Sequence, residues 1–142
     1  MAAATTPAAV VAQAPAAAWR PIAADELLVM TLEGGKRVVI QLAPGLSPRH
    51  VANIVNLAKA HWWDRTSINR VQDNYVAQWG DATEKKPMPP GLSPTSADDY
   101  GLPLANRRLA ITPLPYADPY APSTGYVAGW PVAMDGSAAW LP

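Results

Sequence analysis

The segment that decides the interpretation of this chain is Ser67-Ile68-Asn69-Arg70-Val71-Gln72-Asp73-Asn74-Tyr75-Val76-Ala77-Gln78-Trp79-Gly80-Asp81. It places one arginine between short apolar runs, with an aromatic residue and a glutamine following at short intervals. Two strands joined by a tight polar turn would direct Arg70, Tyr75 and Gln78 toward a common surface. We expect such a surface to hold a neutral, carbonyl-rich ligand such as a peptide backbone.

A strand hairpin is predicted upstream of this segment. Residues 26–32 and 36–42 are two apolar runs rich in β-branched and aliphatic side chains, and Glu33-Gly34-Gly35 separates them. Glycine adopts the positive φ that a tight hairpin turn requires, so the pattern favours two antiparallel strands.

A helix is predicted between the hairpin and the central segment. Ser47 suits the N-cap and Pro48 suits the first helical position, where a missing N–H has no cost. An apolar stripe at helical spacing follows and predicts a helix that ends near His61. The stripe consists of Val51, Ile54, Val55 and Ala58, and we expect Asn53, Asn56 and Lys59 to face water.

The two ends of the chain differ from its middle. Residues 1–20 are rich in Ala and Pro and are predicted to be a disordered tail. Residues 87–142 hold eleven of the sixteen prolines, and proline interrupts helices and central strands. The sequence therefore predicts a folded part at residues 21–86, followed by a Pro-rich insertion or loop region.

Composition excludes several classes of function. Lys and Arg together number 11, as do Asp and Glu, so no net charge favours nucleic acid as a partner. The absence of cysteine excludes disulfides and thiolate metal sites. Two isolated histidines do not suggest a metal centre. No apolar run approaches the length of a membrane span.

The start of the chain bears on its cellular location. Small residues around Val10-Val11-Ala12-Gln13-Ala14 are typical of the stretch that follows an export signal, although the signal itself is absent or incomplete. This pattern favours a periplasmic or secreted protein, with the cytoplasm as the alternative.

The order of motifs over residues 26–82 resembles the cyclophilin family of peptidyl-prolyl cis-trans isomerases. The family's helix pattern Pro-x-x-Val-x-Asn-Phe is similar to Pro48-Arg49-His50-Val51-Ala52-Asn53-Ile54. Its aromatic-Asp-x-Thr loop resembles Trp63-Asp64-Arg65-Thr66. Its signature Phe-His-Arg-Val-(x)4-Phe-Met-x-Gln-Gly-Gly-Asp is similar to the segment from Ile68 to Asp81.

The resemblance implies roles for individual residues. Arg70 would be the catalytic arginine, and Gln78 would hydrogen-bond the substrate backbone. Tyr75 and Val76 would line a pocket for the proline ring. Two positions depart from the family pattern, because Asn69 replaces a histidine and Trp79 replaces a glycine. We expect Trp79 to contact substrate and to alter which peptides fit.

The resemblance also implies a fold and an activity. The fold would be mainly β with helix, an antiparallel β-barrel that is incomplete at the C-terminus, because the motifs of the family's later half are not found. The activity would be rotation of X-Pro bonds in proline-containing polypeptides during protein folding, without a cofactor or metal. Two alternatives are a cyclophilin-like module that binds proline peptides without catalysis, and an inactive fragment.

Overall fold

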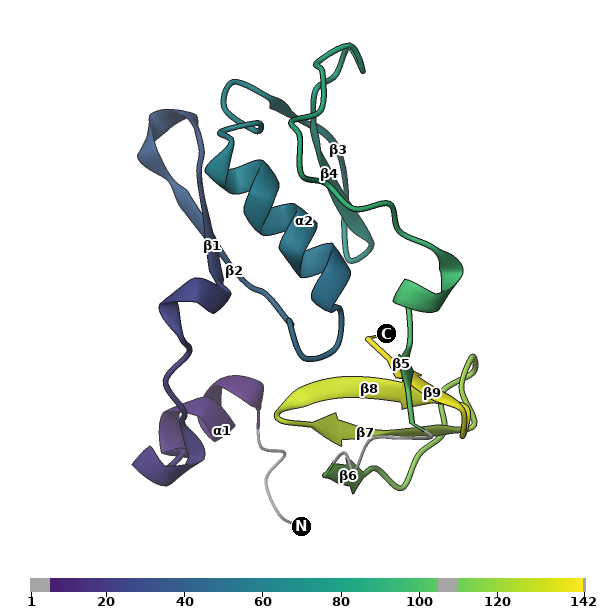
Figure 1. Ribbon diagram of the computed structural model, residues 1–142. Coiled ribbons are helices and arrows are strands. Elements are labelled where there is room, and N and C mark those ends of the chain that lie inside the picture. The colour runs from purple at the N-terminus through teal and green to yellow at the C-terminus, as the bar shows by residue number, and fades with distance from the viewer. Residues whose placement is uncertain (1–5, 105–109, 142) are drawn as a thin grey trace. The chain divides into compact units, whose positions relative to one another are not determined.

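Short antiparallel strands make up most of the regular structure in the computed structural model, which describes residues 6–104 and 110–141 (Figure 1). These residues contain two α-helices and nine strands, so the chain is mainly β with helix, as the sequence predicts. The contacts divide the chain into two units, Met1–Gln41 and Leu42–Pro142, and each is described by itself.

The first unit begins with a short helix, α1 (Pro7–Gln13). The hydroxyl oxygen of Thr6 accepts a hydrogen bond from the N–H of Ala9 at 3.2 Å and caps the helix. No residue of α1 is buried, so the helix adds nothing to a core. The sequence predicts a disordered tail over residues 1–20; residues 1–5 of it lie outside the described part, and the disorder stays a prediction.

The predicted hairpin forms in the same unit. Strands β1 (Leu27–Thr31) and β2 (Arg37–Gln41) are antiparallel, with Val29 opposite Val39 at the centre. The turn is closed by the N–H of Leu32, which donates to the carbonyl of Lys36 at 2.8 Å. Gly34 has φ 79°, a left-handed conformation that glycine adopts at little cost, and this explains why the turn lies there.

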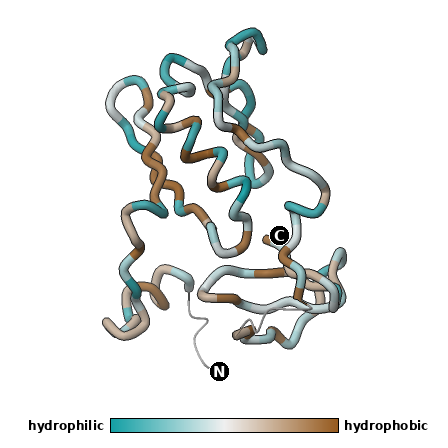
Figure 2. The backbone as a smooth tube through the Cα atoms, viewed as in Figure 1, coloured by the Kyte–Doolittle hydropathy of each residue, from teal (hydrophilic) through white to brown (hydrophobic). Residues whose placement is uncertain are grey.

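The second unit begins with the helix that the Ser-Pro pair predicts. Helix α2 (Pro48–Lys59) has Pro48 at its first position, while the hydroxyl of Ser47 at the N-cap makes no capping hydrogen bond. The helix stops two residues before His61, which has φ 53°. The N–H of Trp62 then donates to the carbonyl of Leu57 at 3.0 Å, a bond characteristic of a Schellman C-cap. Apolar and polar residues alternate along α2 (Figure 2).

The last third of the chain contains a five-stranded antiparallel sheet, in the order β5-β9-β8-β7-β6. Its strands are β5 (Leu102–Pro103), β6 (Ile111–Pro113), β7 (Ser123–Val127), β8 (Trp130–Met134) and β9 (Ala138–Trp140). The sequence interpretation did not predict strands here. Residues 114–122 have no strand apart from one isolated bridge, in agreement with the predicted loop.

The sheet tolerates its prolines because of where they lie. Pro103 and Pro113 are the last residues of the two edge strands β5 and β6. Pro131 lies in the inner strand β8, but β9 pairs with β8 only at Ala133 and Met134. The side of β8 toward β9 is therefore not paired at Pro131, and the missing N–H interrupts no ladder bond there.

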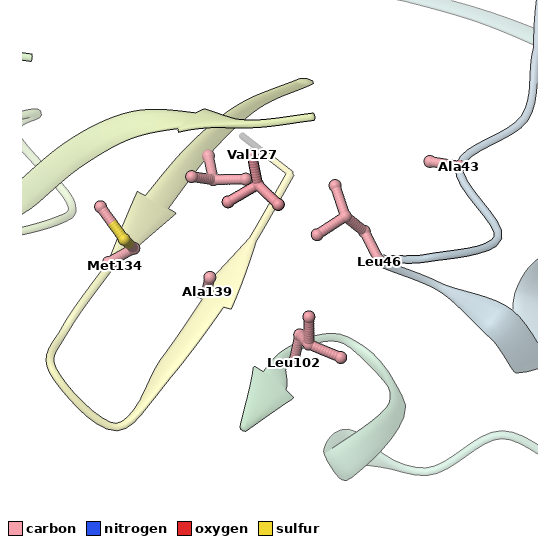
Figure 3. Packing of buried hydrophobic residues seen from close by; sticks show 7 residues of the cluster. Ala43, Leu46, Leu102, Val127, Met134 and Ala139 are labelled. Atoms are coloured by element: carbon pink, nitrogen blue, oxygen red, sulfur yellow. The ribbon is translucent and has the colours of Figure 1, made fainter. Parts of the chain in front are cut away.

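The buried core lies at this sheet (Figure 3). Val132 is 2% exposed and Ala139 is 1% exposed, and Leu46 from the loop before α2 belongs to the same cluster. By contrast, α2 and the strands β1 to β3 have no buried residue among those described. The apolar contacts that stabilise the second unit are thus concentrated away from its first hairpin.

No closed barrel is present among the described residues. Their strands form three separate sheets: β1 with β2, β3 (Ser67–Gln72) with β4 (Val76–Gly80), and the five-stranded sheet. The mainly β class predicted from sequence is therefore confirmed, and the barrel is not.

We predict that Gly125→Ala destabilises the second unit. A Cβ at Gly125 would lie 2.7 Å from the carbonyl oxygen of Thr112 and 3.1 Å from a methyl carbon of Ile111, so β6 and β7 would have to move apart. We expect a loss of about 1–3 kcal/mol, measured by thermal unfolding. Gly45→Ala is the control, because a Cβ there meets no atom within 4 Å. Equal melting temperatures for the two variants would contradict this account.

Candidate functional site

The hairpin of β3 and β4 brings the predicted arginine and glutamine together. Arg70 and Gln78 are direct cross-strand partners, and Gln72 lies opposite Val76. Directly paired residues of an antiparallel sheet point to the same face, with Cβ atoms about 5 Å apart. The predicted common surface for Arg70 and Gln78 is therefore present.

A β-bulge sorts the side chains of this hairpin into two faces. The register shifts between Ile68 and Arg70, so Asn69 has no direct partner. The hydroxyl of Ser67 donates to the Asn69 side-chain oxygen at 2.6 Å, which holds the bulged residue. One face then carries Ser67, Arg70, Gln72, Val76 and Gln78, and the other carries Ile68, Val71, Ala77 and Trp79.

The guanidinium of Arg70 is held in place on the polar face. Its Nη2 donates to the side-chain oxygen of Gln72 at 2.8 Å, and its Cζ lies 5.8 Å from the ring centroid of Tyr75. Arg70 and Gln78 are both exposed, and Tyr75 is 75% exposed. The sequence interpretation did not include Gln72, although its spacing of two residues from Arg70 could have indicated a shared face.

Trp79 belongs to the opposite face. The register places it opposite Ile68 and on the side of Ala77, away from Arg70 and Gln78. A shallow hollow of about 330 Å³ lies at this part of the hairpin and is lined by Trp63, Ala77, Gln78 and Trp79. The pairing thus groups Arg70, Val76 and Gln78, with Tyr75 beside Arg70, and places Trp79 on the opposite face, although Gln78 and Trp79 both line the hollow.

A carboxylate organises the turn that follows β4. The Asp81 side chain accepts hydrogen bonds from the N–H groups of Thr83 at 3.1 Å, Lys85 at 2.8 Å and Lys86 at 2.7 Å. These bonds, first that of Lys86, lower the pKa of Asp81 from its ordinary 3.8 to about 2. Asp81 thus makes hydrogen bonds to the backbone of the turn that follows it.

The chain then runs back along α2 as a segment that we call the strap, residues 86–99. The Lys86 ammonium donates to the carbonyls of Trp62 and Asp64, and lies 5.5 Å from the Trp62 ring centroid. Asn53 and Asn56 donate to strap carbonyls at 2.8 and 3.0 Å. The expectation that these two asparagines face water is therefore wrong, because the strap covers that side of the helix.

The described residues include no group of three or more His, Cys, Asp or Glu that could hold a metal ion. The same residues contain no helix that is long and apolar enough to cross a membrane.

A comparison with protein families identifies the chain's relatives. The family model for cyclophilin type peptidyl-prolyl cis-trans isomerase/CLD matches residues 27–110, more than half of the 142 residues. The chain belongs to this family. The cyclophilin-type match begins with β1, includes the β3–β4 hairpin and the strap, and extends beyond the resemblance seen over residues 26–82. No curated protein matches the chain.

We predict an acid-dependent contribution of Asp81 to stability. Its folded-state pKa of about 2 is lower than its ordinary value, so its contribution is present above about pH 4 and is lost as pH falls toward 2. Asp81→Asn removes the charge. We expect the variant to be less stable than wild type at pH 7, with a difference that shrinks between about pH 4 and 2. Denaturant midpoints at several pH values measure this; a difference independent of pH would contradict it.

Proposed function

We propose that this cyclophilin-type chain accelerates cis-trans rotation of X-Pro bonds in polypeptide substrates, with Arg70 as its catalytic residue. One observation carries the proposal: Arg70 and Gln78 are paired on an exposed face of a hairpin that lies within the family match. Tyr75 and Val76 adjoin them, and both would contact the proline ring. The same proposal includes the use of this activity during the folding of other proteins.

The reaction requires distortion of an amide and no covalent intermediate. Amide resonance sets a barrier of about 18–20 kcal/mol, so a catalyst must bind the twisted amide better than either planar isomer. A guanidinium stays charged and offers several donors in a fixed plane. Arg70 would hold the prolyl carbonyl oxygen, and Gln78 would fix the neighbouring backbone. No cofactor or metal has a role in this chemistry.

Closure of the hairpins into the family's antiparallel barrel is part of the same proposal. A closed barrel would pair the edges of β1, β2, β3 and β4 that have no partner strand among the described residues, and would cover the apolar face that carries Val71 and Trp79. The small-residue stretch at 10–14 supports a periplasmic or secreted location for the activity.

We predict that Arg70→Ala lowers kcat/KM for a proline-containing peptide by about 10²–10³-fold, because it removes the donor to the strained amide. Arg70→Lys keeps the charge but loses the planar donor pair, so it should restore only part of the rate. Arg37→Ala is the control, because Arg37 is an exposed strand arginine outside the site. An isomerase assay on an X-Pro peptide measures the rates. Equal rates for wild type and Arg70→Ala would contradict the proposal.

A second prediction separates the two faces of the hairpin. Gln78→Ala should lower kcat/KM by about tenfold, the value of one hydrogen bond to the substrate backbone. Trp79→Leu should leave kcat/KM unchanged, because Trp79 lies on the opposite face. If Trp79→Leu reduces the rate as much as Gln78→Ala does, Trp79 contacts substrate and the two-face description is wrong.

A binding module without catalysis is the second candidate. It is favoured by the exposure of Arg70 and Tyr75, which leaves the proline ring poorly enclosed by the described residues. Peptide binding that depends on Arg70, without acceleration of X-Pro rotation, would support this function over the enzyme.

A further inference from the structure

The strap is bound to α2 by a regular series of side-chain hydrogen bonds. Each donor comes from the same stripe of the helix, and each acceptor is a backbone carbonyl of the strap. Arg49 donates to the carbonyl of Pro94 at 3.0 Å, Asn53 to that of Ser93 at 2.8 Å, and Asn56 to that of Gly91 at 3.0 Å.

The spacing of the helix matches an extended peptide. From Arg49 to Asn56 the helix rises by about 10 Å, at about 1.5 Å per residue. The three steps from Pro94 back to Gly91 span about 9–11 Å when extended, as proline-rich chains are. The helix and the strap therefore stay in register over two helical turns, and the strap runs antiparallel to α2.

The contacts at Ser93 and Pro94 bind the peptide backbone on both sides of a Ser-Pro step. The side-chain amide of Asn53 both donates to the carbonyl of Ser93 and accepts from its N–H at 2.9 Å. Arg49 binds the next carbonyl, that of Pro94, and its Nε also contacts the Asp99 carboxylate at 3.1 Å. These bonds involve backbone atoms, so another peptide with the same backbone could make them.

The strap is held without a buried anchor. None of residues 86–99 is buried, and the hydrogen bonds of Arg49, Asn53 and Asn56 to it are all exposed. Met88 is 64% exposed. Segments with few buried apolar contacts and exposed hydrogen bonds open locally at low free energy, so a competing peptide can take the place of the strap.

We propose that Arg49, Asn53 and Asn56 form a second peptide-binding site, separate from the Arg70 hairpin. The site takes an extended, proline-containing segment of another polypeptide, which it recognises by its backbone. In the free protein the strap occupies the site, so the segment binds by displacing the strap.

The test uses the full chain and a fluorescent synthetic peptide with the sequence of residues 90–100, followed by anisotropy. A release variant, Ser93→Pro with Asp99→Ala, removes the N–H that Asn53 binds and the carboxylate that Arg49 contacts. A tethered strap competes at high effective concentration, so we expect the release variant to bind the peptide about tenfold or more tightly than wild type. A peptide N-methylated at the Ser93 position should lose this difference and bind the two proteins equally.

Further substitutions in the release variant locate the peptide. Asn53→Asp keeps the shape of the side chain but removes its donor, so the tighter binding of the release variant should be lost. Asn74→Asp, in the exposed β3–β4 turn, is the matched control and should keep the tighter binding. Arg70→Ala should also keep the tighter binding of the release variant. Loss of that gain with Arg70→Ala would assign the peptide to the hairpin and overturn the second site. Equal binding by wild type and the release variant would overturn it as well.

Hydrogen exchange of the wild-type chain provides a measurement that needs no substitution. Excess unlabelled peptide should accelerate exchange at the Ser93 amide, because the strap leaves Asn53. Unchanged exchange at saturating peptide would show that the strap is not displaced and would refute the proposal.

Discussion

The candidate site depends on one constraint, the bulge at Asn69. Side chains alternate strictly along a strand, so Ile68 and Arg70 would share a face if the pairing were regular. The extra residue shifts the register, and Arg70 comes to lie opposite Gln78 while Ile68 lies opposite Trp79. The polar and apolar faces of the hairpin, and with them the separation of the proposed catalytic groups from Trp79, follow from this single irregularity.

The residues after the hairpin connect it to α2. Asp81 accepts hydrogen bonds from the backbone N–H groups of the turn, and Lys86 donates to carbonyls of the loop that follows α2. The strap then follows the helix toward its start. The hydrogen bonds are the main contacts described along this path, and none of residues 86–99 is fully buried. Such a connection has defined geometry and little resistance to local opening.

Local signals account for the parts of the fold that the sequence predicted. Gly34 and Gly35 mark the first turn, Pro48 marks the start of α2, and the Arg70 and Gln78 spacing marks the second hairpin. The C-terminal sheet was missed because its signals are weak. Ala128, with φ 50°, and Gly129 form the tight turn between β7 and β8. Asparagine or glycine at the position of Ala128 would have indicated a hairpin turn, whereas alanine does not. The prolines of this sheet interrupt no ladder hydrogen bond, because they lie where the strand has no partner on one side. Only the observed strand pairing shows this.

The candidate site could be predicted only in part, because the features that decide it leave no local signal in the sequence. The spacing of Arg70, Tyr75 and Gln78 implies a common surface, but the bulge that removes Trp79 from it has no signature in residue type. Contacts such as those of Asn53 with the strap join residues 40 positions apart, and helical periodicity alone places that side chain in solvent.

The core and the candidate site occupy different parts of the second unit. Val132, Ala139 and Leu46 supply the burial, whereas Arg70, Tyr75 and Gln78 are exposed and bear little of the folding free energy. Substitutions on the hairpin's polar face should therefore change the free energy of unfolding little. A thermal melt of this chain therefore reports on its C-terminal sheet and hardly on the hairpin, so an unchanged melting temperature says little about whether the polar face is intact.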